Sequence, residues 1–576
     1  MSKLIRNPLV KKAALTAVGL PQLRKLKKSS RNYLSTQQQF LSTMLDSTRF
    51  TAFGKEHGFE NVRTYDDFKK AVPIRDFEGH RPYVDRMCRG EENVLFPGKA
   101  LFYNTTSGST DKPKLIPVSR EYFENVYSNI SRLWLYSCLT DNRRLFHGKN
   151  LSAVGPAVEG YVEDGTPFGS ISGVTYRNIP GILKDVYATP YPIICMSNYQ
   201  KKYYAMLRCG LSTPITYIIT ANPSTLLQFN RVVRENLNDL IRDIHDGTFR
   251  KDVLAEIEPA YRDEVLAQFP PNKTRARWLE NCAEKYGENI RPRHYWPELE
   301  CVNTWKQGNS RLILPKLNGW FPEQTSVREF GYMASEARAG LTLENHWEYS
   351  VLMAHLYLFE FIEEEKRNDK NPEILLPHEL EIGKRYYIFI TNGSGLFRYD
   401  INDIIRVTGY YNQFPLFEFV QKGEGITSLT GEKLSEFQVI QAVQEASGSS
   451  DIGVENYSMF CDSQHFMYKL YIEFTQQLSA AKKNDFLRLV DEQLKMINHE
   501  YRAKRDSNRL SAPVIRELKP NSYELIKLRL LAEGKVREGQ YKISCLINDP
   551  HLQQVYESSV VNGVNSYSLK ENCSTL

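Results

Sequence analysis

Apolar residues recur along this chain in two patterns, one with the period of a helix and one typical of a strand. Apolar positions three or four residues apart predict helices over residues 37–45, 66–72, 119–139, 226–246 and 251–269. Ser119 is the expected N-cap of the third helix. Short apolar or alternating runs predict strands over residues 93–103, 312–314, 387–391 and 404–409, and residues 214–220 continue a mixed pattern. Because strands and helices alternate, an α/β fold is predicted.

The last third of the chain differs from the rest in its composition and in the order of its predicted elements. The small residues of KGEGITSLT, residues 422–430, indicate a hinge or linker. Beyond it we expect helices over 435–446 and 479–503, a hairpin over 457–462 and 466–474, and a final αβ segment holding 522–531 and 541–546. These features predict a large N-terminal domain over residues 1–424 and a smaller, mobile C-terminal α+β cap domain over residues 425–576.

Composition narrows the class of protein only slightly. The 576 residues are 41% hydrophobic, which is ample for a large core, and the net charge of +6 arises from 74 basic and 68 acidic residues. Such a mild charge on a long chain does not favour a nucleic-acid partner. Nine cysteines without a CxxC pair indicate free thiols in a reducing compartment, so we expect a cytoplasmic protein.

The first 40 residues are basic and contain no acidic residue. They predict a helical segment with two open readings: weak contact with a membrane surface or a targeting role, or an ordinary helix with a solvated basic face. No run of about 20 apolar residues, the length that spans a bilayer, is present.

Several common catalytic motifs are missing from the sequence. There is no Walker A loop, no complete GxGxxG, no HExxH and no GxSxG. Kinase, dehydrogenase, zinc-protease and serine-hydrolase functions therefore have no motif to support them.

The stretch TTSGSTDKPK is a candidate phosphate-binding loop. Thr106, Ser107, Gly108, Ser109 and Thr110 combine hydroxyl groups with a glycine that lets backbone N–H groups approach an anion. Lys114 adds positive charge, and the dipole of the helix expected after the loop favours anions as well. The alternative is a polar surface turn, since turns are commonly rich in Ser, Thr, Gly and Asp.

Two further stretches contain acidic residues beside apolar runs. In FGYMASE, Glu336 is a candidate ligand of Mg²⁺ and Tyr332 a candidate for stacking on a base; the alternative is a strand end with an exposed acid. In YDINDIIRVTG, Asp403 precedes the apolar pair Ile404-Ile405, where a carboxylate can accept both hydroxyls of a ribose. The alternative is a surface ion-pair cluster of Asp400, Asp403 and Arg406.

A lysine near the C-terminus completes the set of candidates. Lys542 lies in GQYK ahead of an apolar run, and on a mobile domain it could close over a phosphate and neutralise charge in a transition state. The alternative is an ordinary lysine on a strand.

The order of these stretches resembles the adenylate-forming superfamily of acyl-CoA ligases and luciferases. TSGSTDKPK, YMASE and the Asp403 stretch are followed by Lys422, Glu424 and Gly431 and by the late Lys542, as in that superfamily. Asp111 stands where the superfamily has glycine, and we expect its side chain to point away from the site or to pair with Lys112.

Within the superfamily, the chain is similar to the acyl acid amido synthetases of the Gretchen Hagen family. The similarity rests on SGST…KLIP, YMASE, DIIRVTGYYNQFPLFEFV and GQYK, and on FGKEHGF at residues 53–59, and it extends over nearly the whole chain.

This resemblance implies a two-step reaction on small-molecule substrates. A carboxylic acid would attack the α-phosphate of ATP to give an acyl-adenylate and pyrophosphate. An amine, expected to be that of an amino acid, would then attack the acyl carbon and release AMP. Two alternatives stay open at this point: transfer to coenzyme A as in acyl-CoA ligases, and an inactive interaction protein on the same fold.

The resemblance also implies a role for each candidate residue. Residues 106–110 and Lys114 would hold the phosphates, Glu336 would bind Mg²⁺, and Asp403 would bind the ribose. Tyr332 and Ser335 would border the adenine and the α-phosphate, Lys422 and Lys433 would flank the hinge, and Lys542 would stabilise the transition state.

Overall fold

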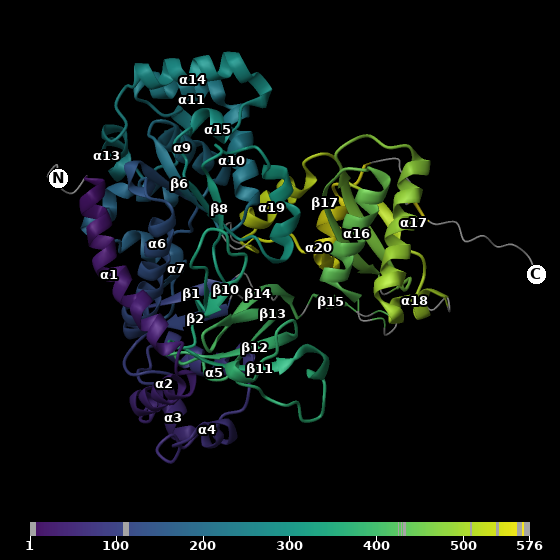
Figure 1. Ribbon diagram of the computed structural model, residues 1–576. Helices are drawn as coiled ribbons and strands as arrows, with labels where there is room; N and C mark the ends of the chain where they lie inside the picture. Colours follow the sequence, from purple (N-terminus) through teal and green to yellow (C-terminus); the bar gives the residue numbers. More distant parts are fainter. Residues whose placement is uncertain are drawn as a thin grey trace, which may run out of the picture. The chain divides into compact units, whose positions relative to one another are not determined.

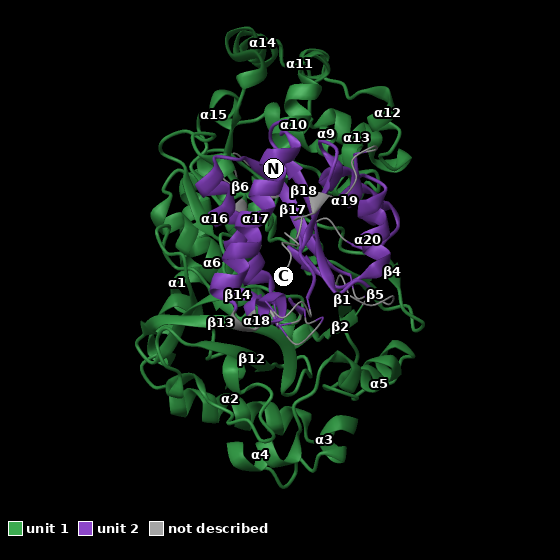
Figure 2. Cartoon of the chain, turned by 90° about the vertical axis from the view of Figure 1, so that its right-hand side faces the viewer, with its two compact units in different colours: residues 1–419, 537–540 green, residues 420–536, 541–576 purple. Residues whose placement is uncertain are grey.

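The computed structural model describes residues 7–106, 114–423, 425–427, 429, 432, 434–462, 464–506, 510–536, 541–561 and 567–568. These residues form two compact units, which Figure 2 distinguishes by colour. Unit 1 comprises the described residues up to Phe419, and unit 2 those from Val420 onward. The division therefore falls within the strand β14 (Phe414–Lys422). Among the described residues, no helix combines the length and the apolar character needed to cross a bilayer.

Unit 1 begins with helices, as the basic N-terminal pattern predicted. The side chain of Asn7 accepts a hydrogen bond from the Leu9 N–H and thereby caps the N-terminus of α1 (Pro8–Ser29). Lys27 and Lys28 in the last turn of α1 interact favourably with the negative end of the helix dipole. Helix α1 runs along α6 (Ser128–Asp141, Figure 1), where a Cβ on Gly19 would lie only 2.3 Å from the Cβ of Tyr136. The next helices are α2 (Tyr33–Thr48), α3 (Ala52–Glu56), α4 (Tyr65–Ala71) and α5 (Phe77–Cys88).

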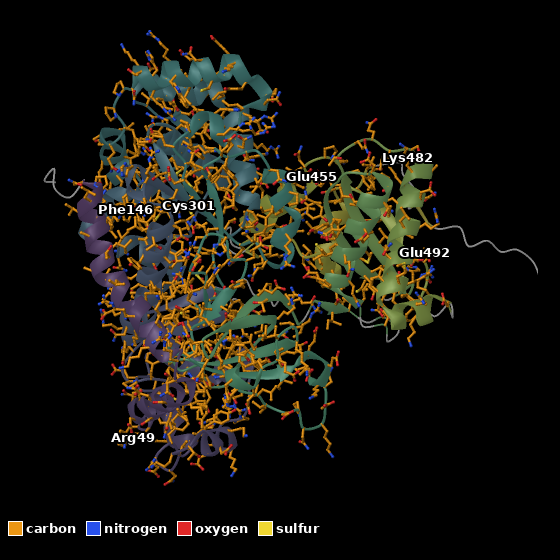
Figure 3. All side chains as sticks on the ribbon, viewed as in Figure 1. Arg49, Phe146, Cys301, Glu455, Lys482 and Glu492 are labelled. Atoms are coloured by element: carbon orange, nitrogen blue, oxygen red, sulfur yellow. The ribbon has the colours of Figure 1, made fainter. Side chains whose placement is uncertain are left out.

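A parallel sheet with the strand order β3-β6-β7-β8 forms one core of unit 1. Its strands are β3 (Lys149–Ser152), β6 (Ile215–Ile219), β7 (Cys301–Thr304) and β8 (Ser326–Glu329). The near-continuous apolar run of β6 is typical of a strand covered on both faces. Figure 3 shows the labelled Cys301 of β7 and Phe146 inside unit 1, and both are buried.

Helices surround this sheet. Every residue of α9 from Lys202 to Leu211 is buried, as expected for a helix packed on several sides. In Figure 1, α11 and α14 lie side by side at the end of unit 1 opposite α2–α4. The helices of this region are α7 (Ile171–Arg177), α8 (Tyr191–Ile194), α9 (Tyr199–Leu211), α10 (Ser224–Glu235), α11 (Leu237–Asp246), α12 (Lys251–Leu254), α13 (Arg262–Ala267), α14 (Lys273–Tyr286) and α15 (Pro292–Tyr295).

A second sheet of unit 1, ordered β2-β1-β5-β4, holds the ends of the candidate phosphate loop. Strand β1 (Phe102–Thr106) pairs antiparallel with β2 (Lys114–Val118), and Thr106 stands opposite Lys114. Strands β5 (Pro167–Gly169) and β4 (Gly160–Tyr161) complete the sheet. The loop therefore joins two paired strands. The prediction that it leads directly into a helix is wrong, because β2 lies between them.

Ser119 does cap the helical segment that follows β2, as predicted: its Oγ accepts a hydrogen bond from the Tyr122 N–H at 3.1 Å. This segment contains a π-helix (Tyr122–Tyr127) before α6. Other predicted elements were wrong in detail. The single helix predicted over residues 226–246 is divided between α10 and α11 at Asn236, and the predicted strand at residues 312–314 lies within 3₁₀ turns, Gly308–Leu312 and Leu314–Leu317.

The third sheet of unit 1 has six strands in the order β11-β12-β13-β14-β10-β9. Its strand β13 (Tyr399–Tyr411) bulges against β12 (Arg385–Thr391), because Ile388 pairs with Asp403 whereas the next residue, Phe389, pairs with Asp400. Asn402 adopts a left-handed φ of 54° inside the bulge, a conformation that Asn tolerates better than most residues. The remaining strands are β9 (Gly340–Leu341), β10 (Ser350–Leu352), β11 (Leu358–Glu363) and β14.

Unit 2 has a five-stranded sheet in the order β20-β17-β18-β19-β21. The predicted hairpin is confirmed as β17 (Val454–Asp462) and β18 (Met467–Phe474). The predicted helix over 479–503 is broken at Asn498 into α17 (Ala480–Ile497) and α18 (His499–Asp506). The other elements are β15 (Ile426–Thr427), β16 (Leu434–Ser435), α16 (Glu436–Ser450), β19 (Val514–Glu517), α19 (Ser522–Ala532), β20 (Leu546–Ile547), α20 (Pro550–Glu557) and β21 (Tyr567–Ser568).

Candidate active site

Tyr332 and Asp403, which lie far apart in the sequence, meet inside unit 1. The Tyr332 hydroxyl donates a hydrogen bond of 2.5 Å to Asp403 Oδ2, and both side chains are buried. The ring of Tyr332 lies near Phe417 and Phe419, with centroids 5.6 Å and 6.1 Å away. Burial, and then the negative charge of Asp403, hold the pKa of Tyr332 well above its usual value, so the phenol remains a donor.

Asp403 owes its position to the bulge of β13. The backbone N–H of Asn402 donates to Asp400 Oδ1 at 2.8 Å, which supports the left-handed turn just before Asp403. The alternative of an ion-pair cluster of Asp400, Asp403 and Arg406 is wrong. Asp400 pairs with Arg367, and Arg406 pairs with Glu418.

Glu336 lies on the same loop as Tyr332 and is only partly buried. The Tyr399 hydroxyl donates to Glu336 Oε1 at 3.1 Å, and the Asn392 side chain donates to the Glu336 carbonyl oxygen at 2.9 Å. Glu336 also acts electrostatically on Tyr332, where it is a weaker cause of the raised pKa than Asp403. Glu336, Tyr332 and Asp403 therefore belong to one cluster.

The loop after β8 is held in place by close backbone packing. Gly331 adopts a φ of 93°, and a Cβ there would lie 2.7 Å from the carbonyl oxygen of Gly340. The Gly340 N–H donates to the Tyr332 carbonyl at 3.0 Å, which closes the loop on itself. Only glycine fits Gly331 without strain, because the turn combines a positive φ with a close backbone neighbour.

The same loop touches the sheet that carries the candidate phosphate loop. Asn104 of β1 donates from Nδ2 to the Ser335 carbonyl at 2.9 Å and accepts from the Ile171 N–H at 3.0 Å. Ser335 Oγ donates to the Thr105 carbonyl at 3.4 Å. Ser335 is therefore adjacent to the strand that ends at Thr106.

For the other predicted site residues, the structure shows the positions of some and does not describe the rest. Lys114 begins β2, with its Nζ 5.9 Å from the ring centre of Phe77, and Lys422 ends β14. Lys542 is exposed on unit 2 and directly follows the buried Tyr541. Two residues further along, the Oγ of the half-buried Ser544 donates a hydrogen bond to Glu436 Oε1 at 2.9 Å. Ser107, Gly108, Ser109, Thr110, Asp111 and Lys433 lie outside the described residues.

Two charged residues near the cluster escaped sequence analysis. Glu329, the last residue of β8, accepts hydrogen bonds from the Gly331 N–H at 2.9 Å and the Lys306 N–H at 2.7 Å. Its burial raises its pKa to about 7. Arg338 is buried two residues after Glu336. The only sequence signal for Arg338 is a charge within the otherwise apolar stretch ARAGLTL.

Models of one protein family match this chain in three consecutive segments. The GH3 family N-terminal domain matches residues 22–326, the central domain residues 350–422 and the C-terminal domain residues 437–551. Among curated relatives, indole-3-acetic acid-amido synthetase GH3.3 of Arabidopsis thaliana is 23% identical over 97% of this chain and 96% of its own. The 4-substituted benzoates-glutamate ligase GH3.12 of the same plant is 24% identical over 86% and 89%.

Solved structures share the fold. GH3.15 acyl acid amido synthetase superposes with a TM-score of 0.83 at 21% identity, covering 95% of this chain and 97% of that one. A 2-hydroxyisobutyryl-CoA ligase gives a TM-score of 0.51 at 12% identity, covering 92% of each chain. The comparisons confirm the predicted fold class and the expected class of enzyme, an adenylate-forming amido synthetase. Because the N-terminal model alone matches more than half of its residues, the chain belongs to the GH3 family, the Gretchen Hagen family that its motifs resemble.

Proposed function

We propose that this protein uses ATP to activate a small carboxylic acid as an acyl-adenylate and then transfers the acyl group to the amine of an amino acid. The first step releases pyrophosphate and the second releases AMP. Activation is required because a carboxylate resists attack by a nucleophile, whereas the acyl-adenylate carries a good leaving group. Catalysis then rests on positioning the reactants and on stabilising the charge that moves between them.

The observation that carries this proposal is the cluster of Tyr332, Asp403 and Glu336. Asp403 is an acceptor for the ribose hydroxyls, and the 2.5 Å hydrogen bond from Tyr332 holds its carboxylate in one orientation. The neighbouring Ser335 lies beside β1, and the candidate phosphate loop starts where β1 ends, at Thr106. A nucleotide on Asp403 would thus have its phosphates directed toward Thr106 and Lys114, the described ends of that loop.

Glu336 suits the binding of Mg²⁺ in the presence of ATP. Mg²⁺ is commonly held by one or two protein carboxylates together with substrate phosphates and water, so a dedicated group of ligands is not required. The described part of the chain contains no group of three or more His, Cys, Asp or Glu arranged as a metal site. The Tyr399 hydroxyl fixes one oxygen of Glu336, and the partly exposed carboxylate can reach an ion. When bound, Mg²⁺ would neutralise charge on the phosphates.

The remaining predicted roles complete the proposal. Lys542 would stabilise the negative charge that develops on the α-phosphoryl group, and Lys422 and Lys433 would flank the hinge and contact phosphate or ribose. We also propose a cytoplasmic location, which the free thiols of the eight described cysteines support.

Weak membrane contact through the N-terminal segment is a separate part of the proposal. In the described part of this segment, Lys12, Arg24, Lys25, Lys27, Lys28 and Arg31 are exposed. Lys11 differs, because it forms a largely buried ion pair with Asp185 at 2.8 Å. Binding to anionic vesicles that is lost when the six exposed residues become Gln would support the contact, and no vesicle binding would refute it.

The direct test of adenylation is ATP–pyrophosphate exchange with a panel of aromatic and aliphatic acids. The proposal requires at least one acid on which exchange depends. No exchange with any acid, together with no ATP binding by calorimetry, would indicate an inactive protein on this fold.

A further inference from the structure

Arg338 is a buried cation enclosed by aromatic rings. Only 4% of the residue is exposed. Its guanidinium carbon lies 5.2 Å from the ring centre of Trp134, 5.7 Å from that of Phe330 and 5.9 Å from that of Tyr127. Its Nη1 donates to Ser131 Oγ at 2.8 Å. These contacts hold the guanidinium in place by cation–π attraction and one hydrogen bond to a neutral group.

Among the described residues, Arg338 forms no ion pair, unlike Arg398 and Arg328, two other buried arginines of unit 1. Arg398 forms an ion pair with Glu360 at 2.7 Å, and Arg328 forms one with Asp141 at 3.1 Å. Burial lowers the pKa of Arg338, and the groups that partly offset this effect, Tyr127, Cys138 and Tyr357, include no carboxylate. A buried arginine normally has an anionic partner, because removing its charge from water costs several kcal/mol.

Two hydrogen-bond donors at this place have no acceptor. Arg338 Nη2 and the indole Nε1 of Trp134 are buried and donate to no group in the described residues. Both atoms can only donate, so an anion or another acceptor is required to satisfy them. Their side chains come from different elements, the loop after β8 and helix α6, and they meet where the guanidinium carbon lies 5.2 Å from the ring centre of Trp134.

Arg338 is adjacent to the residues proposed to bind ATP. It lies in the loop that also carries Tyr332, Ser335 and Glu336. The Tyr127 hydroxyl approaches the sulfur of Met333 at 3.9 Å, and Met333 is only partly buried. The aromatic enclosure therefore borders Met333, the residue after Tyr332. In the proposed function, the acid meets the nucleotide close to this loop.

We infer that Arg338, with the indole N–H of Trp134, recognises a second anionic group on the acyl substrate, so that the preferred acid is a dicarboxylate or an acid with a comparable anionic substituent. This inference rests on the proposed function and names the substrate class of that site. The carboxylate that reacts is a poor partner for Arg338. It loses its charge on adenylation, and an ion pair would weaken it as a nucleophile. A second anionic group stays charged throughout both steps.

The test compares acids that differ only in this group. Terephthalate and its monoamide 4-carbamoylbenzoate, in which the second group is uncharged, form one pair, and glutarate and its monoamide 5-amino-5-oxopentanoate form another. ATP–pyrophosphate exchange is measured for the wild type, Arg338→Gln, Arg338→Lys, Trp134→Phe and the control Arg132→Gln, whose side chain is exposed on α6. Trp134→Phe keeps an aromatic ring and removes only the indole donor.

We expect kcat/KM for the diacid to exceed that for its amide by about 10-fold or more in the wild type, as a charged hydrogen bond predicts. The ratio should fall to about one in Arg338→Gln, be partly restored in Arg338→Lys, fall moderately in Trp134→Phe and stay unchanged in Arg132→Gln. Equal rates for diacid and amide in the wild type, or a ratio that Arg338→Gln leaves intact, would overturn the inference.

A thermal-shift measurement with the same acids separates this inference from the proposed function. Exchange with monoacids but not with diacids would overturn the inference and leave the proposed function standing. If no acid supported exchange, the proposed function would fail. In that case a diacid that raises Tm of the wild type but not of Arg338→Gln would still support the anion site, and no such shift would refute it.

Discussion

The Tyr332 hydroxyl donates a 2.5 Å hydrogen bond to Asp403, and this contact joins the loop after β8 to the bulge of β13. The two elements belong to different sheets of unit 1. The carboxylate proposed to bind ribose therefore already has its orientation before a nucleotide arrives. Preorganisation of this kind lowers the cost of binding.

Tyr332→Phe should weaken ATP binding without disturbing the fold. The ring keeps its place beside Phe417 and Phe419, but Asp403 loses its donor. We expect KM for ATP to rise about 3- to 10-fold, since one hydrogen bond contributes about 1 kcal/mol, with a smaller change in kcat. Steady-state exchange kinetics at varied ATP measure both constants.

A double-mutant cycle with Asp403→Asn tests whether the two residues act together. Asp403→Asn alone should raise KM for ATP more than Tyr332→Phe does. In the double variant, the change in binding free energy for ATP should be smaller than the sum of the changes in the two single variants, because each substitution breaks the same contact. Strictly additive effects would mean that Tyr332 does not act through Asp403.

Lys542→Ala should abolish pyrophosphate exchange. Removing a group that stabilises transition-state charge commonly costs about 10²- to 10³-fold in kcat. The matched control is Lys482→Ala, because Lys482 is also an exposed lysine of unit 2 and lies on α17, where Figure 3 labels it. If Lys542→Ala and Lys482→Ala exchanged at the same rate, Lys542 would have no part in adenylation.

Glu360→Ala should destabilise the protein. Glu360 is buried and accepts from Arg398 Nε at 2.8 Å and from the Tyr65 hydroxyl at 2.7 Å. Its loss leaves Arg398 buried with an unbalanced charge, so we expect the free energy of unfolding to fall by about 3–5 kcal/mol. Denaturant unfolding of the wild type and of Glu360→Ala measures this difference in the free energy of unfolding. Glu381→Ala, which breaks an exposed pair with Lys384, should leave stability unchanged, and similar losses in both variants would contradict the argument.

Glu329 should make stability depend on pH. Burial raises its pKa to about 7, from 4.5 in the unfolded chain, so the folded protein binds more protons between these values. The stabilisation is present below pH 4.5 and is lost as the pH rises to about 7. The loss is roughly 3 kcal/mol for such a shift.

The variant Glu329→Gln removes this titration. The difference in unfolding free energy between wild type and Glu329→Gln should therefore decrease from pH 5 to pH 7 and stay constant above pH 7.5. Urea unfolding at intervals of half a pH unit measures the difference. A difference that does not change between pH 5 and pH 8 would show that Glu329 is ionised throughout.

Sequence patterns predicted local elements well and their long-range placement poorly. The N-cap at Ser119 and the hairpin of unit 2 depend on neighbouring residues and were confirmed. The sequence predicted a helix directly after the candidate phosphate loop and no strand over residues 114–118. They form a strand because β1 supplies a partner, which no local pattern reveals. The break at Asn236 also followed no periodic signal.

In the candidate site, too, the sequence indicated the chemistry of individual residues but not which residues meet. The residue types of Tyr332, Glu336 and Asp403 indicated their chemistry, but the pairing of Tyr332 with Asp403 depends on a bulge that needs a left-handed Asn402. Arg338 escaped attention because a charged residue usually indicates a surface position. Its burial results from three aromatic residues that lie on two separate segments.

Identification of the second product tests most directly whether this protein transfers the acyl group to an amino acid. The protein is incubated with ATP, an acid that supports exchange, and either a mixture of amino acids or coenzyme A, and the products are analysed by mass spectrometry. The proposed function predicts AMP and an acid–amino acid amide, formed only with the amino acids. A coenzyme A thioester without any amide would contradict it.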